Sequence, residues 1–455
     1  MDELFKSSCG RIHRGWWLTP ILLLAVTGAW AGSPAPASNY HRDSVAPSNP
    51  PPWRLEGPLT EELALQRALA CDSRIASLKA AVEVARQERL AATDIKDPVV
   101  QGESRAIGRS ISGANDEIDD ARVSLGVYLP NPWMTLPRVD ARTADYEAAR
   151  ADLRAAVWSV TCEVRRLFAQ LDYLTNDLAF SADEVRLNSE VLDAMQARLK
   201  QGATTASEMM TASRQFLQFQ NEFDQTTHRY QLARQQLAAA LDISPLAFEL
   251  ATNTAPPPLL EPTMGFPDLE GMADRSRYDL AALRWRAQAA ESDYHEIRNQ
   301  RWPWLKELKA GYLDKSDQYW VGAAMDIPIF TWTKNHAADV VRAKSDLARV
   351  EVTNAVKLVR QELHAALDEV DQTRHQQARN DANVKPLIAT MQQALTSLKN
   401  TPNVMPEQLA AAELQVVETM RFDLDTHWQY QLALYNLEQS LGVPLSPEPP
   451  ATPAR

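Results

Sequence analysis

The residue types that could catalyse a reaction or bind a metal are scattered along this 455-residue chain. The eight histidines form no pair at metal-ligand spacing. His364 and His375 share one predicted helix, but no cysteine or further histidine stands at ligand distance from either. No G-x-S-x-G, phosphate-binding loop, G-x-G-x-x-G or H-E-x-x-H pattern occurs. We therefore expect no enzyme activity, no metal site and no cofactor.

Two glutamates occupy equivalent positions of an internal repeat. Glu208 and Glu407 are 199 residues apart, and each follows a predicted turn, just inside the next helix. A carboxylate in the first turn of a helix interacts favourably with the helix dipole, which would explain both residues. In a symmetric oligomer the same carboxylates would instead form one or two rings of negative charge. The sequence leaves both explanations open.

An internal duplication organises the chain. Val157 and Glu163 recur 199 residues later as Val356 and Glu362, and similar matches continue through both halves. Proline-rich segments separate and flank the two copies. The predicted parts are a signal peptide (1–31) that ends in an A-x-A cleavage site, a Pro-rich linker (32–58), a first repeat (59–253), a second Pro-rich linker (254–267), a second repeat (268–443) and a Pro-rich tail (444–455).

Each repeat has the same predicted order: a helix, two short strands, a very long helix, a turn and a further helix. Apolar residues of the first long helix follow three- and four-residue spacing, broken at Ser181 and Asn188, which is typical of coiled-coil packing. The neighbouring helices are each about half as long, so two of them stacked end to end would match one long helix. The predicted helices are 59–96, 136–201 and 206–242, then 268–299, 335–399 and 406–441.

The predicted strands alternate apolar with smaller or more polar residues, as in Val123, Leu125 and Val127. Residues 302–332 hold 7 aromatic side chains in 31 positions, against 7% in the chain, which suits a membrane-interface girdle. Strands of this length cross a bilayer when tilted, whereas a half-buried soluble hairpin is the alternative. The predicted fold class is mainly α with a small β part.

The charge balance argues against nucleic acid as a partner. Lys and Arg number 47 against 59 Asp and Glu, so the net charge is −12, whereas phosphate binding needs a basic face. The chain has only 15 glycines, and its wealth of Ala, Leu, Gln, Glu and Arg also indicates a mostly helical protein.

Three stretches resemble the TolC-like outer-membrane efflux protein family. Residues 59–69 are similar to its opening helix, 327–330 to its strand-to-helix exit, and 201–208 to its helical-hairpin tip. The resemblance covers essentially all of 59–443. It implies a homotrimer in the lipid of the outer membrane, with a twelve-stranded β-barrel and a long coiled-coil α-barrel in the periplasm. It also implies a passive exit duct for small molecules or ions, joined to a periplasmic adaptor and an inner-membrane transporter.

The resemblance also points to functional residues at the periplasmic tips. The family carries acidic gate residues at positions matching Glu208 and Glu407, so these two become candidates for a gate ring. The second tip departs from the family's pattern, because it lacks the usual glycine and contains two prolines. A soluble periplasmic coiled-coil scaffold or adaptor without a barrel is the alternative function. The residues expected to dock the adaptor are Gly202, Ala203, Thr204, Thr205, Asn403 and Val404.

Two cysteines follow the signal peptide. Counting residues from the strands places Cys71 and Cys162 at nearly the same height on neighbouring helices, about 38 Å away at 1.5 Å per residue. An oxidising compartment favours a disulfide, but the bond also requires Cα atoms within about 7 Å. Two free buried thiols are the alternative.

Overall fold

The computed structural model describes residues 57–106, 119–246, 248–249, 265–313, 318–327, 332–401 and 404–445. The predicted signal peptide and nearly all of the Pro-rich segments lie outside these residues. The first repeat contains α1 (Glu61–Cys71), α2 (Ser73–Ala91), β1 (Val99–Ala106), β2 (Asp119–Tyr128), α3 (Pro132–Lys200) and α4 (Ala206–Leu241). The second repeat contains α5 (Phe266–Ser276), α6 (Tyr278–Asn299), β3 (Trp304–Leu313), β4 (Gln318–Asp326), α7 (Trp332–Lys399) and α8 (Pro406–Leu441).

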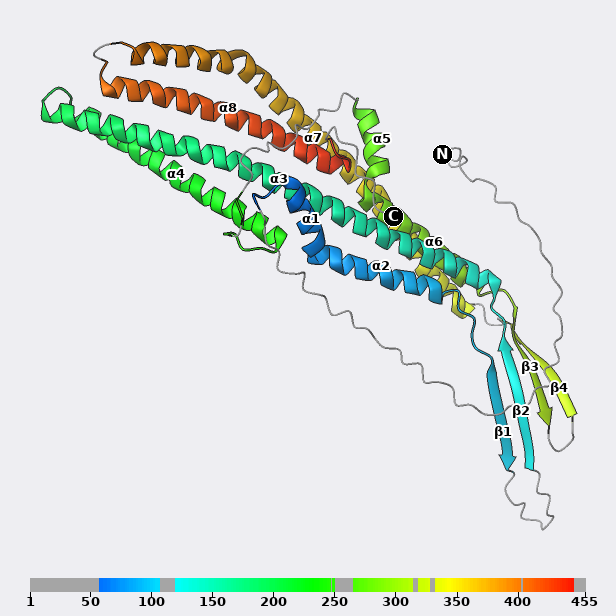
Figure 1. Cartoon of the computed structure of the whole chain (residues 1–455). Coiled ribbons are helices and arrows are strands. Elements are labelled where there is room, and N and C mark those ends of the chain that lie inside the picture. The colour runs from blue at the N-terminus through cyan, green and yellow to red at the C-terminus, as the bar shows by residue number, and fades with distance from the viewer. Residues whose placement is uncertain are drawn as a thin grey trace. The chain divides into compact units, whose positions relative to one another are not determined.

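The predicted fold class is confirmed, because both repeats are long helices with a small antiparallel sheet (Figure 1). The long helices α3 and α7 have 69 and 68 residues, and α4 and α8 have 36 each. At 1.5 Å per residue, α3 is about 100 Å long. It begins four residues before the predicted start, because the Asn131 side chain caps it by accepting the Trp133 N–H at 3.0 Å.

The opening helix of each repeat was predicted to be continuous, and this prediction was wrong. In the first repeat the helix breaks at Asp72, whose backbone is extended and whose carboxylate accepts the N–H groups of Arg74 and Ile75 at 2.7 and 3.4 Å. The second repeat breaks at Arg277, which also has extended backbone angles. A residue that caps a new helix stops the previous one, although the composition on both sides favours a helix.

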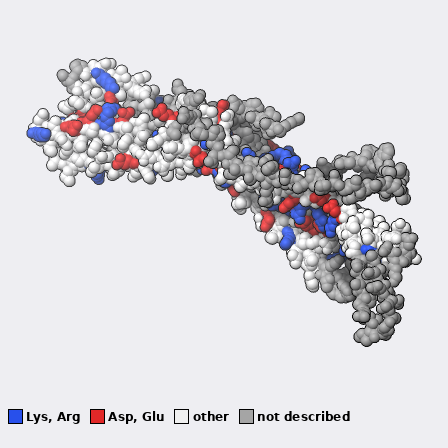
Figure 2. Space-filling view, turned by 60° about the horizontal axis from the view of Figure 1, so that its bottom comes forward, with Lys and Arg blue, Asp and Glu red and all other residues white. Residues whose placement is uncertain are grey.

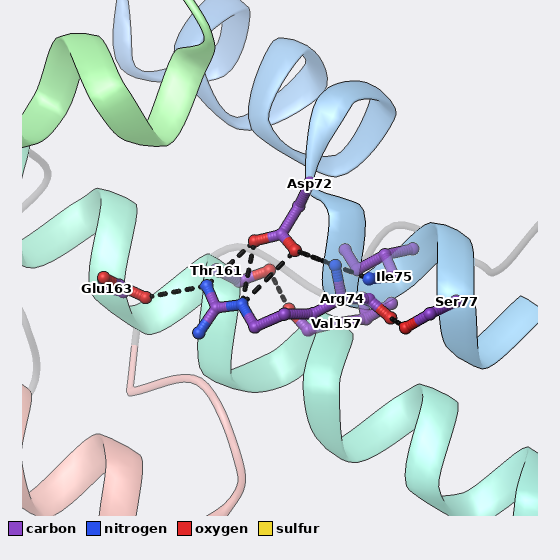
Figure 3. A network of polar contacts seen from close by, with 7 residues as sticks. All are labelled: Asp72, Arg74, Ile75, Ser77, Val157, Thr161 and Glu163. Atoms are coloured by element: carbon purple, nitrogen blue, oxygen red, sulfur yellow. Dashed lines mark hydrogen bonds and ion pairs between the residues drawn. The ribbon is translucent and has the colours of Figure 1, made fainter. Parts of the chain in front are cut away.

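Ionic contacts fix each break against the long helix. Arg74 bridges Asp72 at 2.8 Å and Glu163 of α3 at 3.1 Å, as Figure 3 shows. In the second repeat, Arg277 bridges Asp279 and Glu362 of α7, both at 2.7 Å. The aspartate precedes the arginine in the first repeat and follows it in the second. The duplicated contact is therefore preserved with its two charges exchanged.

Pairs of shorter helices cover each long helix, as predicted. α3 packs against α1 and α2 toward the sheet and against α4 toward the opposite end, where α4 and α1 meet end to end. The Arg67 Nε–H donates to the Leu241 carbonyl at this junction at 3.3 Å. In the second repeat, the Ser276 hydroxyl donates to the Leu441 carbonyl at 2.6 Å. Each junction lies beside one of the two apolar cores, which contain Leu237 and Leu437 among their fully buried side chains.

The two long helices occupy different environments in spite of their shared origin. α3 lies inside the helical layer and packs against α1, α2, α4, α6 and α8, whereas α7 packs mainly against α6 and α8 (Figure 1). Large apolar side chains of α7 are consequently exposed. They are Val340, Leu347, Val350, Leu358 and Leu387.

The strands form one antiparallel sheet in the order β1-β2-β3-β4. The two hairpins are joined because β2 pairs with β3, so that Leu125 lies opposite Ala310. Rows of paired residues place Val100, Leu125, Ala310 and Val321 on one face, and Gln101, Ser124, Gly311 and Trp320 on the other. One face is thus apolar and the other is polar or lined by glycine, as the alternation predicted.

The aromatic residues of this region divide between the two faces. Tyr312 and Tyr319 are cross-strand partners on the apolar face, with ring centroids 5.2 Å apart. Trp320 lies on the polar face, where its indole covers Gly311 and Gly322. Of the aromatic residues expected to form an interface girdle, the two tyrosines lie on the apolar face and Trp320 does not, whereas the side chains of Phe330 and Trp332 lie outside the described residues.

The two cysteines are free, Cys162 being buried and Cys71 half-buried. The bridge from Arg74 to Glu163 joins positions three and one residues beyond the two cysteines, so both lie within the same contact of the opening helices with α3. Burial raises the pKa of the Cys162 thiol to about 12, which keeps it protonated and unreactive at neutral pH.

Replacing Gly311 by alanine should destabilise the sheet. A Cβ there would lie 2.6 Å from the indole nitrogen of Trp320 and 2.7 Å from the Val123 carbonyl oxygen, and the backbone atom cannot move aside. At Gly102 a Cβ meets nothing within 4 Å, so Gly102→Ala is the matched control. We expect Gly311→Ala to lower the thermal melting temperature of the purified protein and Gly102→Ala to leave it unchanged or raise it. Equal melting temperatures would show that the close approach does not constrain the sheet.

Candidate functional site

The first helical tip, residues 201–205, joins α3 to α4 at the end farthest from the sheet. Gly202 has a φ of 71°, and Ala203 donates its N–H to the Arg198 carbonyl at 2.9 Å. This is the glycine-ended helix terminus that a side chain with a Cβ would strain. The predicted glycine-containing turn therefore has a structural reason independent of any partner.

Glu208 caps the helix that follows this tip. Its carboxylate accepts the Thr205 N–H at 3.0 Å and the Thr204 hydroxyl at 2.5 Å, while Thr205 Oγ1 accepts the Glu208 N–H at 3.3 Å. This reciprocal arrangement is a capping box. The Thr204 hydroxyl and the Thr205 N–H lower the pKa of Glu208 from its ordinary value. The carboxylate is exposed, so the same group also presents a negative charge to solvent.

Glu407 has a different role at the equivalent position. It forms an ion pair with Arg198 at the end of α3, and its side chain is 12% exposed. The helix after this second tip begins at Met405 without a side-chain cap and with Pro406 in its first turn. Glu407 therefore links the tips of the two repeats. Of the predicted docking residues here, Val404 is half-buried and Asn403 lies outside the described residues.

A buried polar stripe on α3 was not recognised from the sequence. Asp177, Ser181, Glu184 and Asn188 are each no more than 6% exposed. Their spacing of four, three and four residues places them on one face of the helix, within the coiled-coil seam. Ser181 and Asn188 were noticed only as interruptions of the apolar pattern. Ser181 and Asn188, taken together with Asp177 and Glu184, form a pattern that indicates a polar contact between the repeats.

A second polar contact joins the repeats nearer the sheet. The buried guanidinium of Arg165 donates to Glu61 at 2.9 Å and also pairs with Glu438 of α8. The side chains of Arg165 and Glu438 are 9% and 1% exposed. Removing one partner of such a pair leaves the other charge buried and uncompensated, which is strongly destabilising. The α3–α8 contact is therefore held by ionic as well as apolar packing.

The described residues offer little beyond these contacts for chemistry. Among them, no group of three or more His, Cys, Asp and Glu side chains could hold a metal ion. Charged side chains of both signs are interspersed on the face seen in Figure 2. None of the helices described combines the length and apolar character needed to cross a membrane.

Loss of the first capping box should loosen the start of α4. Thr205→Ala removes the side-chain acceptor of the Glu208 N–H, and loss of such a cap costs about 1 kcal/mol of helix stability. Glu208→Gln retains an acceptor for the Thr205 N–H and is the control. Hydrogen exchange at residues 206–212 should accelerate in the first variant and not in the second. Unchanged exchange in Thr205→Ala would mean that packing alone holds this end.

Comparison with known proteins shows what the chain is similar to. Residues 64–242 match the family model for outer membrane efflux proteins. No curated protein sequence matches the chain. Among solved structures, VceC, an outer membrane protein of Vibrio cholerae, is 17% identical, with a TM-score of 0.66 over 85% of this chain and 97% of that one.

Two further structures share the fold. The MtrE outer membrane channel of Neisseria gonorrhoeae, in its open state, is 18% identical, with a TM-score of 0.63 over 85% of this chain and 89% of that one. The CmeC outer membrane channel of Campylobacter jejuni is 14% identical, with a TM-score of 0.64 over 86% and 90%. The first repeat therefore resembles the outer membrane efflux protein family, and the chain as a whole has the fold of these outer membrane channels.

Proposed function

We propose that this protein is the passive outer-membrane exit duct of a tripartite efflux or type I secretion system, and that it works as a homotrimer. The observation that supports this proposal most directly is that a single chain presents two pairs of unpaired edges. One pair belongs to the sheet and the other to the helical layer.

The sheet has two free edges, β1 and β4, in the described chain. Its apolar face is exposed: Val100 is 69% exposed and Val321 is 83% exposed. An apolar face of this kind belongs in lipid, where unpaired backbone N–H and C=O groups are not tolerated. Pairing β1 with β4 of another copy satisfies both edges, and three copies make the proposed twelve-stranded barrel. The polar face then lines an aqueous passage. These features disfavour a soluble coiled-coil scaffold.

The helical layer also ends in two apolar edges. One is α7, with its exposed valines and leucines; the other consists of α2 and α4. On α2 and α4 the exposed apolar side chains are Val84, Leu90, Met210, Leu217 and Leu232. If the α7 edge of one copy docks on the α2 and α4 edge of the next copy, the exposed apolar side chains of both edges become buried. Rotational symmetry closes such a contact into a ring.

The proposed duct carries small molecules or ions from the inner-membrane transporter and the periplasmic adaptor to the outside. Its walls perform no chemical step, so their contribution is a continuous path and a controllable entrance. We assign adaptor docking to the two tips, at Gly202, Ala203, Thr204, Thr205, Asn403 and Val404. Glu208 and Glu407 are the proposed gate residues. Because Glu407 pairs with Arg198 inside one chain, the exposed negative charge at the entrance comes mainly from Glu208.

Planar-bilayer recordings test the duct and its gate together. The purified protein should give discrete single-channel steps. Changing Glu208 and Glu407 together to glutamine should alter the conductance or its block by cations, because it removes the proposed charge ring. Glu190→Gln is the control, since Glu190 is an exposed α3 residue that pairs with Arg186 at 2.9 Å. Conductance without any change in the double variant would leave Glu208 with its capping role alone. A protein that forms no channels would contradict the duct itself.

A further inference from the structure

A cluster of charged side chains, of which Asp177 and Glu184 are buried, lies where α3, α4 and α8 meet, between the tips and the Arg165 contact. Arg421 of α8 donates from Nε to Asp177 at 2.6 Å and from Nη1 to Glu184 at 2.8 Å. The same guanidinium reaches Glu222 and Thr226 of α4, each at 3.4 Å. The side chains of Asp177 and Glu184 are 5% and 2% exposed.

The cluster contains more acidic groups than basic ones. One guanidinium faces three carboxylates, from Asp177, Glu184 and Glu222, and Glu418 of α8 lies close enough to Glu184 to repel it. Burial is the main cause that raises the pKa of Glu184 to about 7; the positive charge of Arg421 opposes this rise, and repulsion by Glu222 and Glu418 adds to it. Burial and Glu222 also raise the pKa of Glu418. A carboxyl in this position holds a proton over much of the range in which an ordinary glutamate is ionised.

The second repeat carries no charge at the positions equivalent to the two buried carboxylates. With the 199-residue offset of the repeat, Asp177 corresponds to Gln376 and Glu184 to Asn383 of α7. Both counterparts are uncharged amides on an equally long helix. Glu222 itself corresponds to Arg421, so the positive charge occurs only in the second repeat and the buried carboxylates of α3 only in the first. The cluster is therefore specific to the contact between repeats.

We propose that Glu184 is a proton-binding site whose occupancy sets how tightly the α3–α4 hairpin of the first repeat packs on α8 of the second. With the proton bound to Glu184, the guanidinium of Arg421 pairs with the remaining carboxylates, those of Asp177 and Glu222. The hydrogen-bonded cluster then stays intact. Once the proton leaves, an additional negative charge is confined between three helices. The device lies in the periplasmic part of the proposed duct, at the contact through which one repeat holds the other, and it responds to acidity there.

The direction of the response follows from the pKa of Glu184 in the two states. In the separated hairpin the carboxyl has its ordinary pKa of 4.5, and in the packed cluster about 7. Between these values the packed state keeps a proton that the separated state loses, so packing weakens as the pH rises from 4.5 to 7. Below and above this window the contribution of Glu184 is constant. Over the whole window, a pKa difference of this size corresponds to a change of about 300-fold in the local opening equilibrium.

Hydrogen exchange of the full-length protein in detergent tests this proposal without depending on transport. Peptides from residues 177–188 and 415–425 would be compared at pH 5 and pH 7.5, with exchange times corrected for the intrinsic rate of amide exchange. We expect the opening equilibrium to be about a hundredfold larger at pH 7.5 in the unaltered protein. Glu184→Gln, which resembles the protonated carboxyl in shape, should keep the low opening of pH 5 at both values.

Two further variants serve as controls for this experiment. Glu190→Gln, on the solvent side of α3, should retain the full pH dependence. Glu222→Gln removes a neighbouring negative charge and should move the midpoint of the transition to lower pH. The proposal is overturned if the unaltered protein is equally protected at both pH values, or if the dependence persists in Glu184→Gln. It is also overturned if residues 280–291 of α6, remote from the cluster, change to the same extent.

Discussion

Pairing between β2 and β3 is the contact on which the rest of the architecture depends. It joins the strands of two repeats into one sheet and leaves β1 and β4 as edges. In water, such edges can be hydrated, but lipid offers no hydrogen bonds to backbone groups. The apolar face of the same sheet requires lipid or an equivalent cover. In the proposed duct the edges of this sheet meet those of other copies, and the helices attached to the strands follow the same ring.

Duplication followed by divergence explains how two copies of one unit acquired different surfaces. The breaks at Asp72 and Arg277 keep the same contact with α3 and α7 while exchanging the order of its charges. The long helices diverged further, because α3 became central and α7 became an edge. Polar residues could then be buried on α3, where α4 and α8 both supply partners. On α7 the corresponding face retains amides, and the outer face retains exposed apolar side chains.

The tips show how equivalent residues take separate roles once their neighbours differ. At the first tip, Thr205 completes a capping box with Glu208. At the second, Met405 offers no side-chain cap, and Glu407 turns to Arg198 instead. Both carboxylates have partners. Those of Glu208 lie within its own tip, whereas the partner of Glu407 lies in the other repeat. A charge ring built only on repeat equivalence would count six exposed carboxylates in a trimer, whereas these contacts distinguish three exposed from three paired ones.

Sequence patterns predicted those features that local physics determines. Heptad spacing indicated the long helices, alternation indicated the two faces of the sheet, and Gly202 with Thr205 indicated the first tip. The helix break at Asp72 was not predicted, because a single capping side chain causes it within a segment whose other residues favour a helix. The β2–β3 pairing and the Arg198–Glu407 pair were not predicted because they join residues 179 or more positions apart, and no periodicity records such contacts. The stripe from Asp177 to Asn188 was visible, but only its uncharged members interrupted the expected pattern.

Closure of the helical ring is tested most directly by a crosslink between the two edges. The ion pairs Arg74–Glu163, Arg286–Asp152 and Arg349–Glu291 relate heights across the layer and place Val84 of α2 and Val350 of α7 within about one and a half helical turns of each other. Both side chains are more than half exposed, on opposite edges of one chain.

The test uses Val84→Cys with Val350→Cys in outer membranes, in a background where Cys71 and Cys162 are replaced by alanine. A short thiol crosslinker should yield a covalent species of three subunits, whereas either single variant, or Val84→Cys with Leu387→Cys near the tip, should not. Monomers alone after crosslinking of the first pair would contradict a ring closed through these edges.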